Sequence, residues 1–238
     1  MSEAYLLVSH GSKDSRQQVM MEGLAKNLGD RLESCSNYDA SGGLLSPTKC
    51  DYRVGAAYLE LQPQSLQQQI VNFSKQVIDK GCRTLRILPL FLLEGIHVTE
   101  DIPREVELAQ QILGADISIQ LQPYLGSYWG LQNLLAKKIA DRSLDGKIII
   151  AHGSRRVEAN TSIEAIAISV NAVAAYWAVS PSLKDIVFQL VADGKKKIVV
   201  FPYFLFPGVI NDTIAQSIQE FELQDRNIVV DVKSVYNI

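Results

Sequence analysis

Short apolar runs alternate along this chain with segments whose apolar residues have helical spacing. The runs have the length of buried strands, and the periodic segments have the pattern of helices with one apolar face. The predicted strands are residues 4–8, 52–58, 84–88, 117–122, 147–151, 197–201 and 228–233. The predicted helices are residues 15–32, 65–80, a helix that begins at Pro103, and residues 127–141, 158–176, 182–193 and 213–221. Strands that alternate with helices predict an α/β fold with mainly parallel sheets flanked by helices.

A segment rich in Ser, Gly and Asn interrupts this alternation between Glu33 and Thr48. Gly42-Gly43 and Pro47 within it are turn-forming residues, so the segment is predicted to be a surface loop. A tolerated insertion and a lid over a site are both compatible with this composition.

An internal repeat is the strongest pattern in the sequence. Residues 6–12 read Leu-Leu-Val-Ser-His-Gly-Ser, and residues 148–154 read Ile-Ile-Ile-Ala-His-Gly-Ser. A second pair of similar segments, residues 87–95 and 199–208, follows in the same order. We therefore expect two similar domains from an internal duplication, residues 1–126 and 127–238. Because two fused copies can replace a two-fold dimer, a monomer with internal pseudo-two-fold symmetry is predicted.

Composition narrows the classes of partner. The formal net charge is −3 and Lys and Arg are scattered, so no basic face for nucleic acid is expected. The N-terminal apolar run is far shorter than the roughly 20 residues of a membrane span, and no cationic segment precedes it. We therefore expect a cytoplasmic protein without a membrane partner. Cys35, Cys50 and Cys82 are odd in number and widely spaced, which argues against a disulfide framework, a zinc finger or an iron–sulfur cluster.

Three side chains with the chemistry of a metal site follow predicted strands of the first copy: His10, Glu60 and His97. Ligands of parallel α/β sheets collect beyond the carboxyl ends of the strands, where these residues are expected. Neutral imidazole binds divalent iron, cobalt and nickel, and imidazole and carboxylate both accept protons.

The second copy keeps only one of the three. His152 corresponds to His10, but Ala178 stands at the position of Glu60 and Ile210 at the position of His97. The chemistry is therefore expected in the first copy, and the second copy is expected to be degenerate.

Together these segments resemble a known family. The paired His-Gly-Ser strands, residues 58–60 before Pro63, and residues 89–92 followed by 95–97 and 101–103 are similar to the class II tetrapyrrole chelatases. Within these, the chain most resembles the long, two-copy sirohydrochlorin chelatases of sirohaem and cobalamin synthesis. The resemblance covers essentially the whole chain, with residues 33–51 as the main unmatched stretch.

The resemblance implies a lyase that inserts a divalent metal into sirohydrochlorin without ATP or a bound organic cofactor. The metal is a substrate: Fe²⁺, Co²⁺ or Ni²⁺, of which we favour Fe²⁺, giving sirohaem. The resemblance also implies that His10 and His97 bind the metal and accept protons. Because its carboxylate can also accept protons, Glu60 is expected to be the third catalytic group. Residues expected to contact sirohydrochlorin are Ser12, Leu92, Leu93, Glu94, Gly95 and Ile96.

Two other functions stay open from the residues alone. A metal-dependent hydrolase is one, although hydrolases usually have a denser cluster of histidines and carboxylates. A carrier of metal or tetrapyrrole is the other, and it would bind without turnover.

Overall fold

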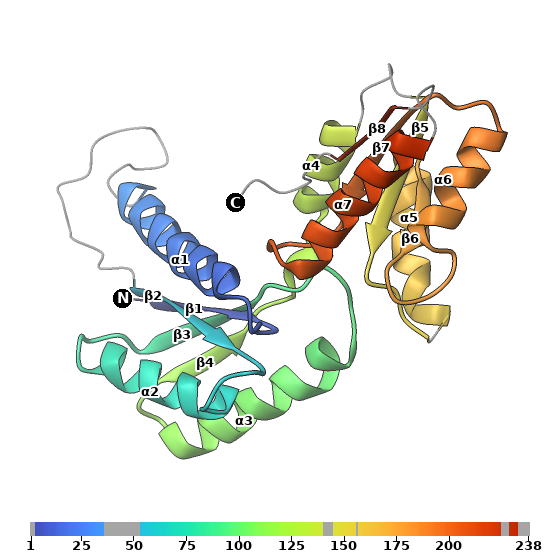
Figure 1. The fold of residues 1–238 in the computed structure, drawn as a ribbon. Coiled ribbons are helices and arrows are strands. Elements are labelled where there is room, and N and C mark those ends of the chain that lie inside the picture. Colours follow the sequence, from blue (N-terminus) through green and yellow to red (C-terminus); the bar gives the residue numbers. More distant parts are fainter. Residues whose placement is uncertain (1–2, 36–52, 140–144, 156, 225–228, 233–238) are drawn as a thin grey trace. The chain divides into compact units, whose positions relative to one another are not determined.

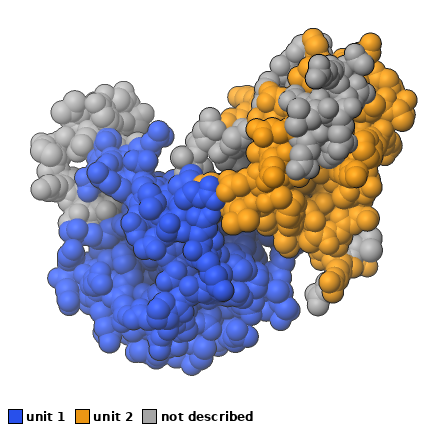
Figure 2. Space-filling model, viewed as in Figure 1, with its two compact units in different colours: residues 1–125 blue, residues 126–238 orange. Residues whose placement is uncertain are grey.

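The structure is a computed structural model that describes residues 3–35, 53–139, 145–155, 157–224 and 229–232. The chain forms two compact units, Met1–Leu125 and Gly126–Ile238 (Figures 1 and 2). Each unit is a four-stranded parallel sheet flanked by helices, which confirms the predicted α/β fold. Most of the loop predicted between Glu33 and Thr48 lies outside the described residues.

The first unit has its strands in the order β2-β1-β3-β4. Its elements are β1 (Glu3–Ser9), α1 (Ser15–Cys35), β2 (Arg53–Tyr58), α2 (Leu66–Ile78), β3 (Thr84–Pro89), the π-helical turn η1 (His97–Asp101), α3 (Ile102–Leu113) and β4 (Ser118–Leu121). Because β1 lies between β2 and β3 and all three are parallel, their carboxyl ends are adjacent at one edge of the sheet.

Both faces of this sheet are covered, and Figure 1 shows α1 on one face with α2 and α3 on the other. Alternate residues of β1, namely Ala4, Leu6 and Val8, are buried in the core that α2 and α3 complete. On the opposite face, the side chain of Gln17 in α1 donates to the Ser9 hydroxyl at 3.4 Å. Successive residues of β1 thus face opposite sides of the sheet, as in any β-strand.

Local signals place the helix ends as predicted. Ser65 forms a capping box with Gln68 at the start of α2, and Gly81 follows this helix with a φ of 86°. Pro103 lies in the first turn of α3, where its missing N–H costs little.

The second unit repeats the topology, with strand order β6-β5-β7-β8. Its elements are η2 (Leu125–Ser127), α4 (Trp129–Ile139), β5 (Gly146–Ala151), η3 (Val157–Asn160), α5 (Thr161–Ser169), β6 (Val173–Tyr176), α6 (Leu183–Ala192), β7 (Lys197–Pro202), α7 (Val209–Gln224) and β8 (Val229–Val232). The outer residues of three predicted elements lie outside the described residues: residue 52 of one strand, residues 140–141 of a helix, and residues 228 and 233 of another strand.

One predicted helix is wrong. The sequence pattern predicts a single helix over residues 158–176, but α5 ends at Ser169 and residues 173–176 form strand β6, paired with β5. Asn171 adopts a left-handed φ of 55°, which no helix continues through. The alanines of this segment favour helix locally, and pairing with the neighbouring strand overrides that preference.

One predicted helix start is late, because α7 begins at Val209 rather than near residue 213. The start predicted at Pro103 agrees with α3, which a π-helical turn, His97–Asp101, directly precedes. None of the helices in the described part of the chain combines the length and the apolarity that a membrane span needs.

Candidate active site

His10 and Glu60 are brought together by the pairing of β1 with β2. The strand ladder continues past the strand ends, because the N–H of Leu59 donates to the Ser9 carbonyl at 2.9 Å and that of Glu60 to the His10 carbonyl at 2.8 Å. The two residues thus occupy neighbouring positions at the carboxyl edge of the sheet. Their side chains approach to 3.8 Å between His10 Nε2 and Glu60 Oε2.

Gly11 allows this close approach. Its φ is 99°, and a Cβ atom there would overlap the carbonyl oxygen of Glu60 and lie 3.0 Å from its carbonyl carbon. Leu61 on the other side of Glu60 has a φ of 60°, an uncommon conformation for a residue with a branched side chain. Unusual backbone conformations on both sides of the contact therefore hold Glu60 against the end of β1.

His97 reaches the same place from the loop after β3. It begins the π-helical turn η1, and its ring lies edge-on to that of His10, with centroids 4.9 Å apart and an interplanar angle of 77°. Phe91, from the same loop, has its ring centroid 6.2 Å from that of His97. The loop and π-helical turn after β3 thus supply the second imidazole of the site.

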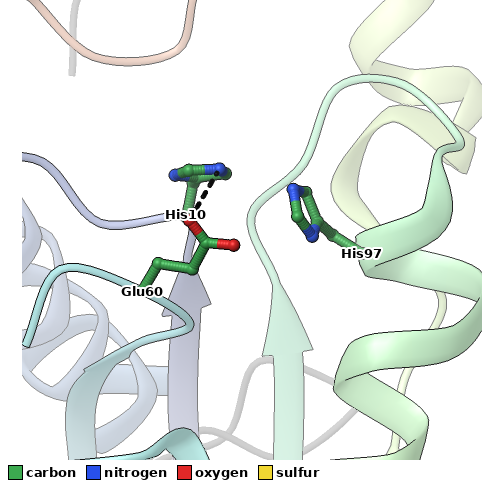
Figure 3. Close-up of side chains that lie close together, drawn as sticks. All are labelled: His10, Glu60 and His97. Carbon is green, nitrogen blue, oxygen red and sulfur yellow. Dashed lines mark ion pairs between the residues drawn. The ribbon is translucent and has the colours of Figure 1, made fainter.

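The three side chains form a possible metal site, shown in Figure 3. One ligand atom from each of His10, Glu60 and His97 lies within 4.8 Å of the others. Ligand atoms around a tetrahedral ion with bonds of about 2.1 Å are about 3.4 Å apart, so modest side-chain rotation would bring all three onto one ion. The side chains of His10 and Glu60 are about half exposed, which keeps the site open on one side.

Sequence reasoning missed a fourth residue, Asp101. Its carboxylate lies 2.8 Å from Nδ1 of His97, and its other oxygen accepts from Arg104 at 3.3 Å. The spacing of four residues between His97 and Asp101 predicts this contact if the segment is helical. The sequence pattern predicts a helix only from Pro103, so it does not place His97 and Asp101 on one helical face.

The residues predicted to contact sirohydrochlorin lie on two loops of the first unit. Leu92 and Leu93 are half-buried and Glu94 and Ile96 are exposed, all between β3 and His97. Ser12 follows β1, and its hydroxyl accepts from the N–H of Asp14. It does not cap α1, because that helix begins three residues later, where the carboxylate of Asp14 accepts from the N–H of Arg16 in the first turn.

The second unit has the same strand-end geometry but keeps only His152 of the three candidate ligands. Gly153 has a φ of 79°, and the N–H of Ala178 donates to the His152 carbonyl at 2.8 Å, just as Glu60 does to His10. The structure thus confirms the alignment of Ala178 with Glu60. Ile210, at the start of α7, packs against the apolar core of this unit.

Two equivalent tyrosines near these sites are core residues. Tyr58 ends β2 and Tyr176 ends β6, and both are buried. Burial, together with the charge of Glu22, raises the pKa of Tyr58. Burial and the neighbouring carboxylate of Glu164 raise the pKa of Tyr176 to about 12. Both phenols therefore stay protonated at neutral pH and are poor candidates for bases.

Comparison with known proteins bears on this geometry. The CbiX family model matches residues 4–142 and 146–236, nearly the whole chain. The chain belongs to the CbiX family. The resemblance recognised in the sequence is therefore confirmed at the level of the family.

Individual members of the family are similar at low identity. The sirohydrochlorin ferrochelatase of Bacillus subtilis (strain 168) is 22% identical over 249 aligned positions, covering 96% of this chain and 84% of the relative. The sirohydrochlorin cobaltochelatase of Priestia megaterium is 22% identical over 241 positions, covering 95% of this chain and 72% of the relative. The crystal structure of the sirohydrochlorin chelatase SirB from Bacillus subtilis subspecies spizizenii in complex with cobalt has a TM-score of 0.65 and 20% identity. That match covers 100% of this chain and 90% of SirB, and it shows the shared fold.

Proposed function

We propose that this CbiX protein is a sirohydrochlorin chelatase whose active site lies in the first unit. The observation that carries the proposal is the cluster of His10, Glu60 and His97, with ligand atoms within 4.8 Å of one another at the carboxyl edge of the sheet. Relatives named for sirohydrochlorin chelation align along nearly the whole chain, which supports the choice of substrate.

Metal insertion requires two coupled transfers. The ring gains a divalent ion at its four nitrogens and loses two pyrrole N–H protons. A group that delivers the ion frees a lone pair, and the same lone pair can accept a proton. We infer that His10 and His97 hold the metal and then take up the protons as the ion leaves. The charge of the site then changes little, because one dication leaves as two protons arrive.

Glu60 has a different proposed role. Its carboxylate lies 3.8 Å from Nε2 of His10, beyond direct hydrogen-bonding distance and close enough to become a ligand or a proton acceptor with a small rotation. We propose that it completes the metal site and passes protons to solvent, to which it is half exposed.

Residues around the cluster are proposed to hold the macrocycle. The half-buried side chains of Leu92 and Leu93 and the exposed side chain of Ile96 offer apolar surface to its flat face. Ser12, Glu94 and Gly95 lie on the same two loops, where polar groups can meet the substituents of the ring.

The proposal is tested by mixing anaerobic sirohydrochlorin with Fe²⁺, Co²⁺ or Ni²⁺ and following visible absorbance against the uncatalysed rate. Imidazole and carboxylate ligands suit all three metals and do not rank them, so each metal is assayed in turn, with Fe²⁺ as the favoured substrate and Co²⁺ as the alternative. His10→Ala and His97→Ala are each expected to remove most of the catalysed rate, since both imidazoles are solvent-accessible and outside the apolar core. Equal rates in wild type and either variant would refute the assignment.

The same assay separates the two alternatives. A carrier of metal or tetrapyrrole would give a stoichiometric absorbance change and no turnover. A metal-dependent hydrolase would leave sirohydrochlorin unchanged. Turnover that requires Glu60 supports the chelatase. Because Glu60 is proposed to pass protons, Glu60→Gln is expected to lower the rate more than it lowers metal affinity.

The proposed assembly is a monomer in which the second unit is a degenerate copy. Light scattering of the purified full chain is expected to give the mass of one chain. A stable dimer would contradict the idea that duplication has replaced a two-fold partner.

A further inference from the structure

Asp101 is placed to control the second imidazole of the site. Its Oδ2 atom lies 2.8 Å from Nδ1 of His97, and its side chain is 25% exposed. We propose that Asp101 is a positioning residue that keeps the proton of His97 on Nδ1 and so leaves the lone pair of Nε2 for the metal. The inference rests on the proposed function and extends it to a residue outside the metal-ligand cluster.

The hydrogen bond itself selects the tautomer. An ionised carboxylate can only accept hydrogen bonds, so the Nδ1 that it contacts must be the donor. A neutral imidazole carries one N–H, and its other nitrogen then has a free lone pair. Metal-binding histidines in general are oriented in this way by a partner on the second ring nitrogen.

The same arrangement recurs more weakly at the other imidazole. Nδ1 of His10 lies 3.3 Å from the carbonyl oxygen of Gly11, while its Nε2 is the atom nearest Glu60. A backbone carbonyl is also an acceptor, so both histidines have an acceptor beside Nδ1. His97 has the shorter and charged contact, and charge-assisted hydrogen bonds are the stronger kind.

The π-helical turn explains how the helix makes room for Asp101. In the second unit, four positions separate Ile210 from the fully buried core residue Ile214. In the first unit, five positions separate His97 from Ile102, which corresponds to Ile214 and is also fully buried. The extra residue is accommodated because the N–H of Ile102 donates to the His97 carbonyl, five residues back.

This difference frees a position for a carboxylate. Side chains four residues apart on a helix lie on the same face. Where the second unit uses that position for an apolar core residue, the first unit has Asp101, and its core isoleucine comes one residue later. Arg104, one turn on, donates to the other oxygen of Asp101 at 3.3 Å, which leaves Oδ2 to face His97.

The tautomer can be measured directly in the full-length protein without metal or tetrapyrrole. Long-range ¹H–¹⁵N spectra distinguish a protonated ring nitrogen from an unprotonated one, and the chain has only three histidines to assign. Wild-type His97 is expected to carry its proton on Nδ1. In Asp101→Ala, the signals of His97 are expected to shift to those of a tautomer mixture. An unchanged His97 tautomer, or a wild-type proton on Nε2, would overturn the proposal.

Calorimetric titration with Co²⁺ alone gives the second readout. Asp101→Ala is expected to weaken Co²⁺ binding about 10-fold or more, as loss of such a partner does at other metal sites. Glu100→Gln is the matched control, because it removes an exposed negative charge from the same turn, and its affinity is expected within about twofold of wild type. Equal losses in the two variants would mean that charge, and not the hydrogen bond, is responsible.

A conservative variant guards against misfolding. Asp101→Asn keeps an acceptor of the same shape without the charge, so its Co²⁺ affinity is expected to lie between those of wild type and Asp101→Ala. Should Asp101→Ala fail to fold, unchanged affinity in Asp101→Asn would overturn the proposal. Neither the tautomer nor the Co²⁺ affinity requires sirohydrochlorin for its measurement. If both change as expected but the wild-type protein has no chelatase activity, the proposed function is rejected and the role of Asp101 is retained.

Discussion

A matched pair of glycine variants separates the stability of the strand ends from their role in the site. Gly11 and Gly153 occupy equivalent positions in the two units, with φ values of 99° and 79°. Alanine at either position costs about 1–2 kcal/mol for the left-handed backbone and about 1–3 kcal/mol for overlap with its neighbours. Each variant is therefore expected to lose about 2–5 kcal/mol of unfolding free energy.

The two overlaps differ in what they displace. A Cβ at Gly11 would meet the backbone of Glu60, whereas a Cβ at Gly153 would lie 2.7 Å from Cβ of Tyr176 and 2.8 Å from Cγ2 of Val179. Relief of the first overlap requires a movement of the Glu60 backbone by about 1 Å. A displacement of that size at a reacting group can lower a rate about 100-fold. Gly11→Ala should therefore lose far more activity than Gly153→Ala.

The assay combines three measurements on both variants. Urea unfolding gives the stability, anaerobic metal insertion into sirohydrochlorin gives the rate, and Co²⁺ titration gives the affinity, all at a temperature where both variants are folded. Similar destabilisation with activity lost only in Gly11→Ala is the expected result. If the two variants lose activity equally, or if Gly11→Ala keeps the full rate, the contact between Gly11 and Glu60 does not position the site.

Variants at three further positions test separate features. Ile210→His should leave turnover unchanged, because Ala178 supplies no carboxylate in the second unit; a doubled rate would contradict this. Leu61→Gly should keep Co²⁺ affinity and Leu61→Val should lower it several-fold, because a β-branched residue tolerates a φ of 60° poorly; the reverse order would refute backbone strain as the cause. Hydrogen bonds from Arg86 lower the pKa of Glu3, so this pair stabilises the fold above the ordinary carboxyl pKa and the benefit is lost as pH falls. The melting-temperature deficit of Glu3→Gln at pH 7 should accordingly shrink at pH 3, and a constant deficit would count against the pair.

Much of the fold was predictable because its signals are local. Apolar runs, helix caps such as Ser65 and terminating glycines such as Gly81 depend on a few neighbouring residues. The repeat of His-Gly-Ser adds a second example of each element, and it aligns Ala178 with Glu60 from the order of residues alone. Where propensity and repeat disagree, as at residues 173–176, the repeat is the better guide, because a duplicated strand keeps its partner strand.

The sequence by itself determined which residues end strands and therefore that His10, Glu60 and His97 belong at one edge of a parallel sheet. Only the tertiary structure decided that they meet, since this requires β1 to lie between β2 and β3, and strand order is set by pairing between distant segments. The contact of His97 with Asp101 was likewise decided by the fold. The π-helical turn holds one residue more between His97 and the buried Ile102 than α7 holds between Ile210 and the buried Ile214, and both isoleucines reach the core.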